Sequence, residues 1–367
     1  MVNKMFLKKI KIHSMKNLYK ITIAIFFIAL IILPFQNSFG GNKDRSGQAG
    51  ATELLINPWA KTSGWGGAGS ATVTGLEAIY GNVGGLAQVH GLDVGLSYTN
   101  YLSMADVNIY SFGLASKVGE SGAFGMSIMS MSFGTLDRTT TVLPDAGAGT
   151  FNPSLMNINI AYSRSFSNSI HGGFVLKIIS ESVADASAQG VAIDAGIQYI
   201  TGKNENIKLG VALKNLGTPM RFSGDGLSIR SYIDLFDKNK YTSEWRSEKF
   251  ELPAQLNIGL GYDFLLGERS RFTLAGTFIS NSFTYDQYVI GGEFSMRDIL
   301  LLRVGYTYED KMWDDVARLT LHQGLSAGFS VQVPLNKEEG THIGIDYSFQ
   351  ATRAFDGIHR LGVIFTL

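Results

Sequence analysis

The stretch Asn257-Ile258-Gly259-Leu260-Gly261-Tyr262-Asp263-Phe264 alternates between two kinds of side chain at every step. Its even-numbered positions carry large apolar residues, and its odd-numbered positions carry glycine or a polar residue. A period of two is typical of a β-strand with two different faces, whereas the pattern of a helix repeats about every 3.6 residues. The same alternation recurs in residues 191–199, 207–214 and 343–349. The sequence therefore predicts an all-β fold from about residue 91 onward.

Fourteen segments with this pattern follow one another to the end of the chain. Most are longer than the roughly 5–6 residues of strands in soluble sheets, and long enough for a tilted strand to cross a membrane. We expect a 14-stranded antiparallel transmembrane β-barrel over residues 91–367. The predicted strands are 91–102, 106–116, 121–134, 154–166, 169–182, 188–200, 205–216, 251–264, 269–280, 285–296, 299–308, 319–333, 340–350 and 355–367.

The predicted connections differ systematically in length. The three longest, 135–153, 217–250 and 309–318, all follow odd-numbered strands, whereas the connections after even-numbered strands are short. All long loops therefore lie on one side of the barrel. Outer-membrane barrels have this asymmetry, with short periplasmic turns and longer outer loops.

Charged residues in the predicted strands fall on the face that also carries glycine, alanine and serine. A charge that faces lipid near the bilayer midplane costs roughly 2–4 kcal/mol for Lys or Arg, so we place these residues in the lumen. Because the charges are of both signs, we expect them to pair across the interior, as a structural network rather than a transport pathway. They are Lys177, Asp194, Lys208, Lys214, Asp263, Glu293, Arg303, Asp346 and Arg360.

The first forty residues have the pattern of an export signal. Six lysines precede the apolar run Ile21–Leu33, and Ser38-Phe39-Gly40 supplies the small residues of a cleavage site. A basic segment, a short apolar run and a small-x-small exit predict a cleaved secretory signal peptide over residues 1–40. We therefore expect the mature protein in the cell outer membrane, in contact with its lipid.

Composition excludes several classes of function. The chain has 367 residues, no cysteine and equal numbers of basic and acidic residues, 31 of each. Without cysteine there is no disulfide scaffold and no thiolate metal site or nucleophile, and without a basic field we expect no nucleic-acid partner. The six histidines, His13, His90, His171, His322, His342 and His359, show no metal-ligand spacing. We predict no enzyme activity, no metal and no cofactor, and we interpret the acidic segment 309–318 as a solvated loop rather than a calcium site.

Residues 41–90 lack the strand pattern. Tight backbone turns are expected at Gly66-Gly67 and at Gly84-Gly85, with a short amphipathic stretch between them. We predict that this segment is a plug or hatch at the periplasmic mouth of the barrel. The residues that we expect to define the plug are Trp65, Gly66, Gly67, Asn82 and Leu86.

The order of short motifs in this segment resembles the PorV/PorQ family of Bacteroidetes, which is part of the wider group of FadL-like barrels. The motifs are Ala60-Lys61, Trp65-Gly66-Gly67-Ala68, Glu77-Ala78 and Tyr80-Gly81-Asn82-Val83-Gly84-Gly85-Leu86-Ala87, together with Lys214-Asn215-Leu216-Gly217 and Leu252-Pro253. Trp65 stands where the family has Met, Glu77 where it has Asp, and Val83-Gly84 where it has Pro-Ala. The resemblance implies a fourteen-stranded barrel associated with the type IX secretion system, and a translocon, a sortase or the C-terminal domains of secreted cargo as partners.

The long loop 217–250 is the strongest candidate for partner contact, because loops beyond about 15 residues are usually functional or disordered. It is rich in aromatic residues, Met and Arg, which are enriched at the centres of interfaces. A loop that folds over and seals the barrel mouth is an equally good interpretation. The candidate partner-binding residues are Met220, Arg221, Phe222, Phe236 and Trp245, with Trp313 on the loop 309–318.

Two functions therefore compete. The first is a protein-docking component of type IX secretion or surface attachment that acts through its outer loops. The second is a FadL-like transporter of hydrophobic small molecules, which predicts an apolar lumen and a lateral opening, with Gly172-Gly173 or Gly291-Gly292 weakening strand pairing. An open porin is a weaker third reading, because a plug of about fifty residues argues against a free channel.

Overall fold

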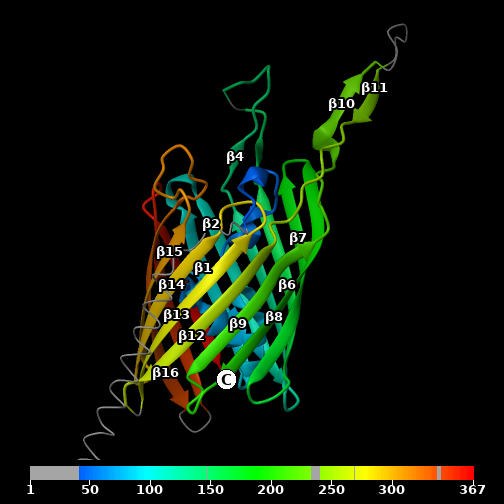
Figure 1. Ribbon diagram of the computed structural model, residues 1–367. Helices are drawn as coiled ribbons and strands as arrows, with labels where there is room; N and C mark the ends of the chain where they lie inside the picture. Colours follow the sequence, from blue (N-terminus) through cyan, green and yellow to red (C-terminus); the bar gives the residue numbers. More distant parts are fainter. Residues whose placement is uncertain (1–40, 146, 233–239, 268, 337–339) are drawn as a thin grey trace, which may run out of the picture. The chain divides into compact units, whose positions relative to one another are not determined.

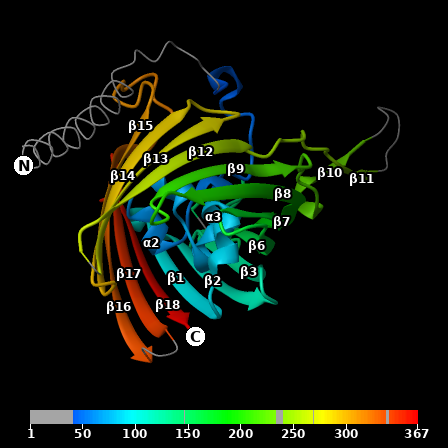
Figure 2. The same cartoon turned by 60° about the horizontal axis from the view of Figure 1, so that its bottom comes forward.

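Fourteen long strands close on themselves in the computed structural model, which describes residues 41–145, 147–232, 240–267, 269–336 and 340–367. Every barrel strand runs antiparallel to its neighbours, and the first strand pairs with the last, from Asp93 opposite Thr366 to Asn100 opposite His359. Closure leaves the barrel without an edge strand (Figures 1 and 2). The predicted 14-stranded antiparallel barrel is confirmed. The predicted signal peptide, residues 1–40, lies outside the described residues.

The barrel strands begin and end within four residues of the predicted positions. They are β1 (Leu92–Leu102), β2 (Val107–Val118), β3 (Gly122–Ser132), β6 (Ser154–Ser165), β7 (Ile170–Val183), β8 (Ala186–Thr201), β9 (Ile207–Gly217), β12 (Gln255–Leu265), β13 (Ser270–Asn281), β14 (Gln287–Met296), β15 (Leu300–Glu309), β16 (His322–Asn336), β17 (Thr341–Thr352) and β18 (Ile358–Thr366).

Two of the long predicted loops contain small hairpins of their own. In the first, β4 (Leu136–Asp137) pairs with β5 (Thr150–Phe151), and in the second, β10 (Ser228–Ser231) pairs with β11 (Tyr241–Glu244). Both hairpins extend beyond the same end of the barrel, which we call the loop end (Figure 1). The opposite end, with the short connections, is called the turn end.

The segment before β1 is a series of single helical turns. They are η1 (Lys43–Arg45), η2 (Thr52–Leu55), α2 (Ala60–Ser63), η3 (Ala68–Ala71), η4 (Gly75–Glu77), α3 (Ala78–Gly81) and η5 (Val83–Gln88), and two further turns, η6 (Ser103–Ala105) and η7 (Asp225–Leu227), lie later in the chain. In the part of the chain that the structure covers, no helix is long and apolar enough to span a membrane.

The two faces of the barrel wall differ as the alternation predicts. On β8, Val191, Ile193 and Ile197 expose 44%, 52% and 56% of their surface on the outside of the wall. Asp194 and Gln198, on the same strand, point inward and are buried. An apolar outer face suits hydrocarbon, and the polar groups of the inner face are kept from it.

The buried apolar core lies between the inner wall and the N-terminal segment rather than within the wall. Trp59, Leu76, Ile79 and Leu86 are almost fully buried and belong to one cluster with residues of the wall such as Val175. The segment and the barrel therefore share one core.

Glycines on the inner wall allow this close packing. An added Cβ at Gly305 would lie 2.3 Å from the carbonyl carbon of Trp65, and one at Gly210 would lie 2.5 Å from the carbonyl oxygen of Ser70. Backbone atoms of the segment thus occupy the space that side chains would fill on these strands.

We expect Gly305→Val to displace the segment around Trp65. The added side chain would overlap the Trp65 backbone, and overpacking of this kind costs about 1–3 kcal/mol or more. The measurement is the rate at which a protease cuts residues 41–90 in the detergent-purified barrel, which should rise in the variant. Gly276→Val is the control, because a Cβ there meets only Val289 O, at 3.5 Å. Equal protection of both variants would contradict this packing.

Candidate functional site in the barrel lumen

Asn82 fixes the N-terminal segment to the barrel wall. Its amide nitrogen donates to the backbone oxygens of Ser70, Ile197 and Val211 at 2.9, 3.0 and 3.4 Å, and its amide oxygen accepts from the Gly84 N–H at 3.1 Å. Ile197 and Val211 face each other on β8 and β9. The single side chain therefore joins two turns of the segment to two neighbouring strands.

The other residues predicted for the plug also contact the wall. Trp65 is buried against Gly305 and Gly291, and Gly66 accepts a hydrogen bond from the Thr307 hydroxyl at 3.2 Å. Leu86 is fully buried next to Gly125, while Gly67 has a left-handed φ of 96° that begins the turn η3. The segment is not confined to the turn end. Ala49 forms a β-bridge with Glu251, which lies just before β12 at the loop end.

The nine charged residues predicted for the lumen all lie on the inner face, where eight are buried and Lys208 is half-buried. Six of them form ion pairs along the wall, between neighbouring strands, and not across the interior as expected. Lys177 Nζ lies 2.7 Å from Asp194 Oδ2, and Lys208 Nζ lies 2.8 Å from Asp263 Oδ2. The reason is geometric, since the N-terminal segment occupies the space between opposite walls.

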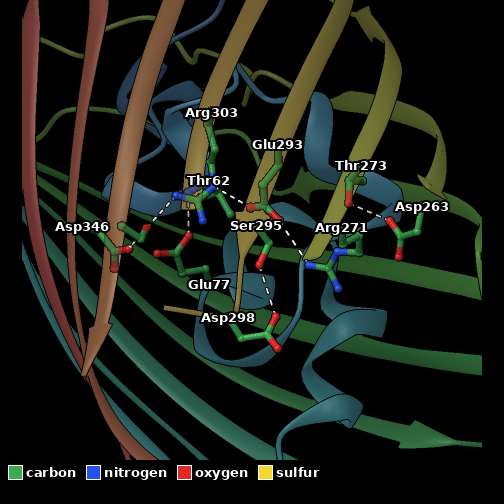
Figure 3. Close-up of polar contacts among 11 residues, drawn as sticks. Thr62, Glu77, Asp263, Arg271, Thr273, Glu293, Ser295, Asp298, Arg303 and Asp346 are labelled. Atoms are coloured by element: carbon green, nitrogen blue, oxygen red, sulfur yellow. Dashed lines mark hydrogen bonds and ion pairs between the residues drawn. The ribbon is translucent and has the colours of Figure 1, made fainter. Parts of the chain in front are cut away.

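Arg303 is the centre of a polar network on the inner wall (Figure 3). Its Nε donates to Glu293 Oε2 at 2.7 Å, and its Nη1 donates to the Ser330 hydroxyl at 2.6 Å, which in turn donates to Asp346. Arg271 Nη2 lies 3.3 Å from the second Glu293 oxygen. Every charge in this network thus has an opposite charge or a hydrogen-bond partner, which is how buried ions are tolerated.

Glu77 belongs to the segment and lies beside this network. Its Oε2 accepts from the backbone N–H of Thr62 at 2.8 Å. Burial, and next the nearby Asp346 carboxylate, raise the pKa of Glu77 to about 7, against the opposing effects of Lys61 and Arg303. The segment therefore places a buried carboxyl group beside the charged residues of the wall.

Glu53 is a second buried carboxyl of the segment, and it is expected to make stability depend on pH. Burial, and next the Glu181 carboxylate, raise its pKa from 4.5 to about 7. The folded protein therefore holds a proton that the unfolded chain releases, so stability is greatest at low pH and falls between about pH 4.5 and 7.

In Glu53→Gln this dependence should be lost, because the amide does not titrate. We expect the wild type to lose on the order of 2–3 kcal/mol of unfolding free energy between pH 5 and 8 relative to the variant. Urea midpoints of both proteins at the two pH values provide the measurement. Parallel changes in the two proteins would show that Glu53 does not hold the proton.

A cavity of about 390 Å³ lies between the segment and the loop end of the wall. Its apolar lining comes from the segment, from β13 and from the loop after β15, and includes Leu55, Ile56, Ile279, Met312 and Leu319. Its polar lining comes from the loop-end residues of several strands, and includes Lys214, Asn257, Glu309, His322, Gln350 and Arg360. Only Lys214 and Arg360 of these six were predicted site residues, because the others are single polar residues near predicted strand ends.

The cavity has the size of a small-molecule site, for which about 300–1,000 Å³ is typical. Its mixed lining suits a molecule with an apolar body and a polar group. In the described part of the chain, no three His, Asp or Glu side chains are grouped to hold a metal ion.

The predicted partner-binding residues separate into two groups. Met220 is 1% exposed and packs with Leu54 of the segment and Ile179 of the wall, with Phe222 and Phe250 partly buried against the same cluster, so its side chain is buried and not on the surface of the loop. Arg221, Trp245 and Trp313 are exposed, Trp245 by 66% and Trp313 by 60%. Phe236 lies outside the described residues.

The lateral opening expected from the glycine pairs is absent from the described strands. Pairing runs without a register shift through Gly172-Gly173, between β6 and β8, and through Gly291-Gly292, between β13 and β15. Glycine fits an antiparallel ladder without loss of backbone hydrogen bonds, so these pairs do not interrupt the wall. A shift does occur between β8 and β9, where Asp194 accepts the backbone N–H of Asn215 at 2.7 Å.

Together these features define a class: a closed, fourteen-stranded barrel of the transmembrane type, with a polar inner wall and a folded segment packed against that wall. Solved structures with this fold include the toluene transporter TodX of Pseudomonas putida, with a TM-score of 0.52 and 13% identity over 84% of this chain and 97% of that one. The monoaromatic hydrocarbon channel CymD has a TM-score of 0.51 and 13% identity, over 85% of this chain and 96% of that one. A FadL homologue of Pseudomonas aeruginosa has a TM-score of 0.50 and 13% identity, over 83% of this chain and 98% of that one.

At this level of identity the likeness shows the fold alone. No protein-family model matches the sequence, and no curated protein matches it either.

Proposed function

We propose that this protein is a non-enzymatic outer-membrane barrel that admits small molecules with an apolar body into the cavity at the loop end. Residues 41–90 act as the plug that closes the lumen beneath this cavity. The observation that carries the proposal is the cavity itself, about 390 Å³ and lined by both apolar and polar side chains. Two structural neighbours, a toluene transporter and a monoaromatic hydrocarbon channel, favour the same class of cargo.

Uptake by intact cells with a lipopolysaccharide outer membrane tests this proposal. Cells that express the protein should take up at least one of three labelled probes, toluene, octanol or benzoate, several-fold faster than cells that express Asn257→Trp. Asn257 lines the cavity, so tryptophan at this position fills it. Leu260→Trp, on the outer face of the same strand, should behave like the wild type. Equal uptake of all three probes by wild type and Asn257→Trp would refute the proposal.

Docking of a partner protein is a second candidate function, and the β10–β11 hairpin is the observation that favours it. The hairpin extends beyond the barrel, and Ile229, Tyr232 and Trp245 expose 38%, 55% and 66% of their surface on it and next to it (Figure 1). Its base is fixed, because Met220 pairs with Phe250 and Ser187 with Ser223. An exposed apolar surface of this kind is suited to protein contact. The resemblance to PorV-like proteins would make a type IX translocon, a sortase or a cargo domain the partner.

Co-purification from the native envelope distinguishes this candidate. If docking is correct, a stoichiometric partner should accompany the wild type and be lost when residues 225–248 are replaced by a short Gly-Ser linker. Shortening of the β4–β5 loop, residues 139–148, is the control and should leave the partner bound. A barrel that purifies alone in all three forms would rule out docking through the hairpin.

A further inference from the structure

Four buried oxygen atoms on neighbouring elements have no hydrogen-bond partner in the described part of the chain. They are Oε1 of Glu53 in the segment, Oγ of Ser111 on β2, Oδ1 of Asn157 on β6 and Oε1 of Glu181 on β7. The four residues are 3%, 5%, 3% and 6% exposed. Buried polar atoms nearly always have a partner, so four such atoms in one region indicate a bound group.

Strand register brings the three wall residues together. Ser111 and Asn157 both lie opposite Met129 of β3, and Glu181 lies diagonally across from Asn157 on the neighbouring strand. Glu53 faces this patch from η2, and it lines a cavity of about 20 Å³ together with Ser111 and Asn157. A cavity of more than about 10–15 Å³ by this measure holds one group of the size of a water molecule.

The two carboxyl groups at this place have no cation. Neither Glu53 nor Glu181 forms an ion pair with a described residue, and Lys177, which also lines the cavity, is held by Asp194 at 2.7 Å. Because the pKa of Glu53 is raised to about 7, two adjacent negative charges are present above that pH. A water molecule satisfies hydrogen bonds but leaves this charge without compensation.

We propose that the cavity binds one calcium ion, with Glu53, Asn157 and Ser111 as ligands and the Glu181 carboxylate balancing the second charge. The ligand atoms are carboxylate, amide and hydroxyl oxygens, which suit a hard cation, whereas zinc prefers nitrogen and sulfur. Magnesium keeps several of its water molecules, and a cavity of about 20 Å³ has no room for them. Sodium carries only one charge against two carboxylates.

The ion would join the segment to the wall at one point. Calcium takes about 6–8 oxygens at flexible geometry, and Ser127 and Asn159 add two side-chain oxygens to the lining. The three unpartnered ligands come singly from η2, β2 and β6, so the sequence alone predicts no metal here. The inference concerns the attachment of the segment and is independent of the cargo in the larger cavity.

Calcium and a proton compete for the Glu53 carboxylate. Since calcium binds the deprotonated form, its affinity should be about tenfold higher at pH 8 than at pH 6, as for the displacement of one proton from a group with a pKa of about 7. The titratable groups that face Glu53 are Glu181 and Lys177 of β7 and Tyr80 of α3, and β2, β3 and β6 add none to the lining. The loss of stability with rising pH predicted above should appear in a chelator and be offset by calcium.

Terbium luminescence of the full barrel in a non-ionic detergent tests the inference. Terbium takes the place of calcium at oxygen sites, and Trp59, which lines the cavity, can sensitise its emission. We expect saturable emission at pH 8 that calcium displaces and equal concentrations of magnesium do not. Glu53→Gln should weaken terbium binding by about tenfold or more, because affinity follows the charge of the ligands.

Glu309→Gln is the matched control and should bind terbium as the wild type does. Glu309 is 4% exposed and its Oε1 also lacks a partner, but it lines the larger cavity. Terbium bound at the acidic loop 309–318, next to Trp313, would give emission that survives Glu53→Gln and is thereby distinguished.

Three results would overturn the inference and leave a water molecule as the occupant: no saturable emission from the wild type, the same terbium affinity at pH 6 and 8, or unchanged affinity in a folded Glu53→Gln. Heat-modifiable migration shows whether each variant has folded. If Glu53→Gln has not, Asn157→Leu and Ser111→Ala provide the same comparison, since each removes one neutral ligand.

Discussion

Removal of residues 41–88 should convert a closed barrel into an open channel. The segment contacts the barrel from Ala49, near the loop end, to Leu86, which packs on Gly125 near the start of β3. A barrel of fourteen strands is wide enough to leave an aqueous path when nothing fills it. In planar lipid bilayers we expect the wild type to be silent and the deletion variant to conduct steadily at all voltages.

The matched control is the deletion of residues 139–148, which shortens an outer loop and leaves the lumen filled. It should remain as silent as the wild type. A folded 41–88 deletion without conductance would contradict the plug, and so would a wild type that already conducts at the same level. Heat-modifiable migration shows in each case that the barrel has formed.

Lys177→Met should be among the most destabilising single substitutions in the wall, by about 3–5 kcal/mol. Lys177 and Asp194 have side chains only 4% and 5% exposed, so the substitution leaves a buried carboxylate without its cation. Asn215 contacts both residues: its side-chain oxygen accepts from Lys177 Nζ at 2.6 Å, and its backbone N–H donates to Asp194 Oδ1 at 2.7 Å. The substitution would therefore also remove a contact that holds Asn215 at the strand irregularity. Urea unfolding in detergent micelles measures the effect.

The double variant Lys177→Met/Asp194→Leu should recover much of this loss, because no unpaired charge remains. Arg138→Gln is the surface control, since Arg138 pairs with Asp185 where both side chains are exposed, 39% and 55%, and such pairs contribute about 0–1 kcal/mol. A cost for Lys177→Met no larger than that of Arg138→Gln would show that the buried pair does not stabilise the wall.

The strands could be predicted because a barrel wall has two different environments. Residues that point inward pack against polar groups, and residues that point outward face hydrocarbon. The sequences of β8 and β12 therefore alternate with a period of two along most of their length. The start of β12 was predicted too early, at 251 instead of Gln255. Pro253 lacks the N–H that a ladder requires, and the chain before it forms an isolated bridge to Ala49.

The small hairpins and the polar pairs could not be predicted in the same way. Strands of two to four residues, such as β4 and β10, are too short to show a period. The partner of an inward charge depends on strand register and on what fills the lumen, which alternation does not specify. Asn82 was predicted as a residue of the plug and Arg360 as an inward residue of the wall, but their contacts with Ile197 and Asn57 arise from tertiary packing.

One departure from the PorV/PorQ pattern has a structural explanation. Gly84 stands where that family has alanine, and an added Cβ would lie 2.8 Å from the Gln198 nitrogen and 2.9 Å from the His171 oxygen. The backbone here is pressed against β7 and β8 more closely than a methyl group allows. Glycine at this position thus allows the turn η5 to pack closely on the wall.

The contacts of the N-terminal segment also constrain the order in which the molecule assembles. Gly66 and Thr307 are 241 positions apart, and Asn57 and Arg360 are 303 apart, so the segment finds these partners only after the last strands have been delivered. Contacts so distant in sequence are slow to form. Until then Trp59 and Trp65 remain open to water and to other chains. The two tryptophans are therefore buried only once β1 has paired with β18 and the barrel is closed around the segment.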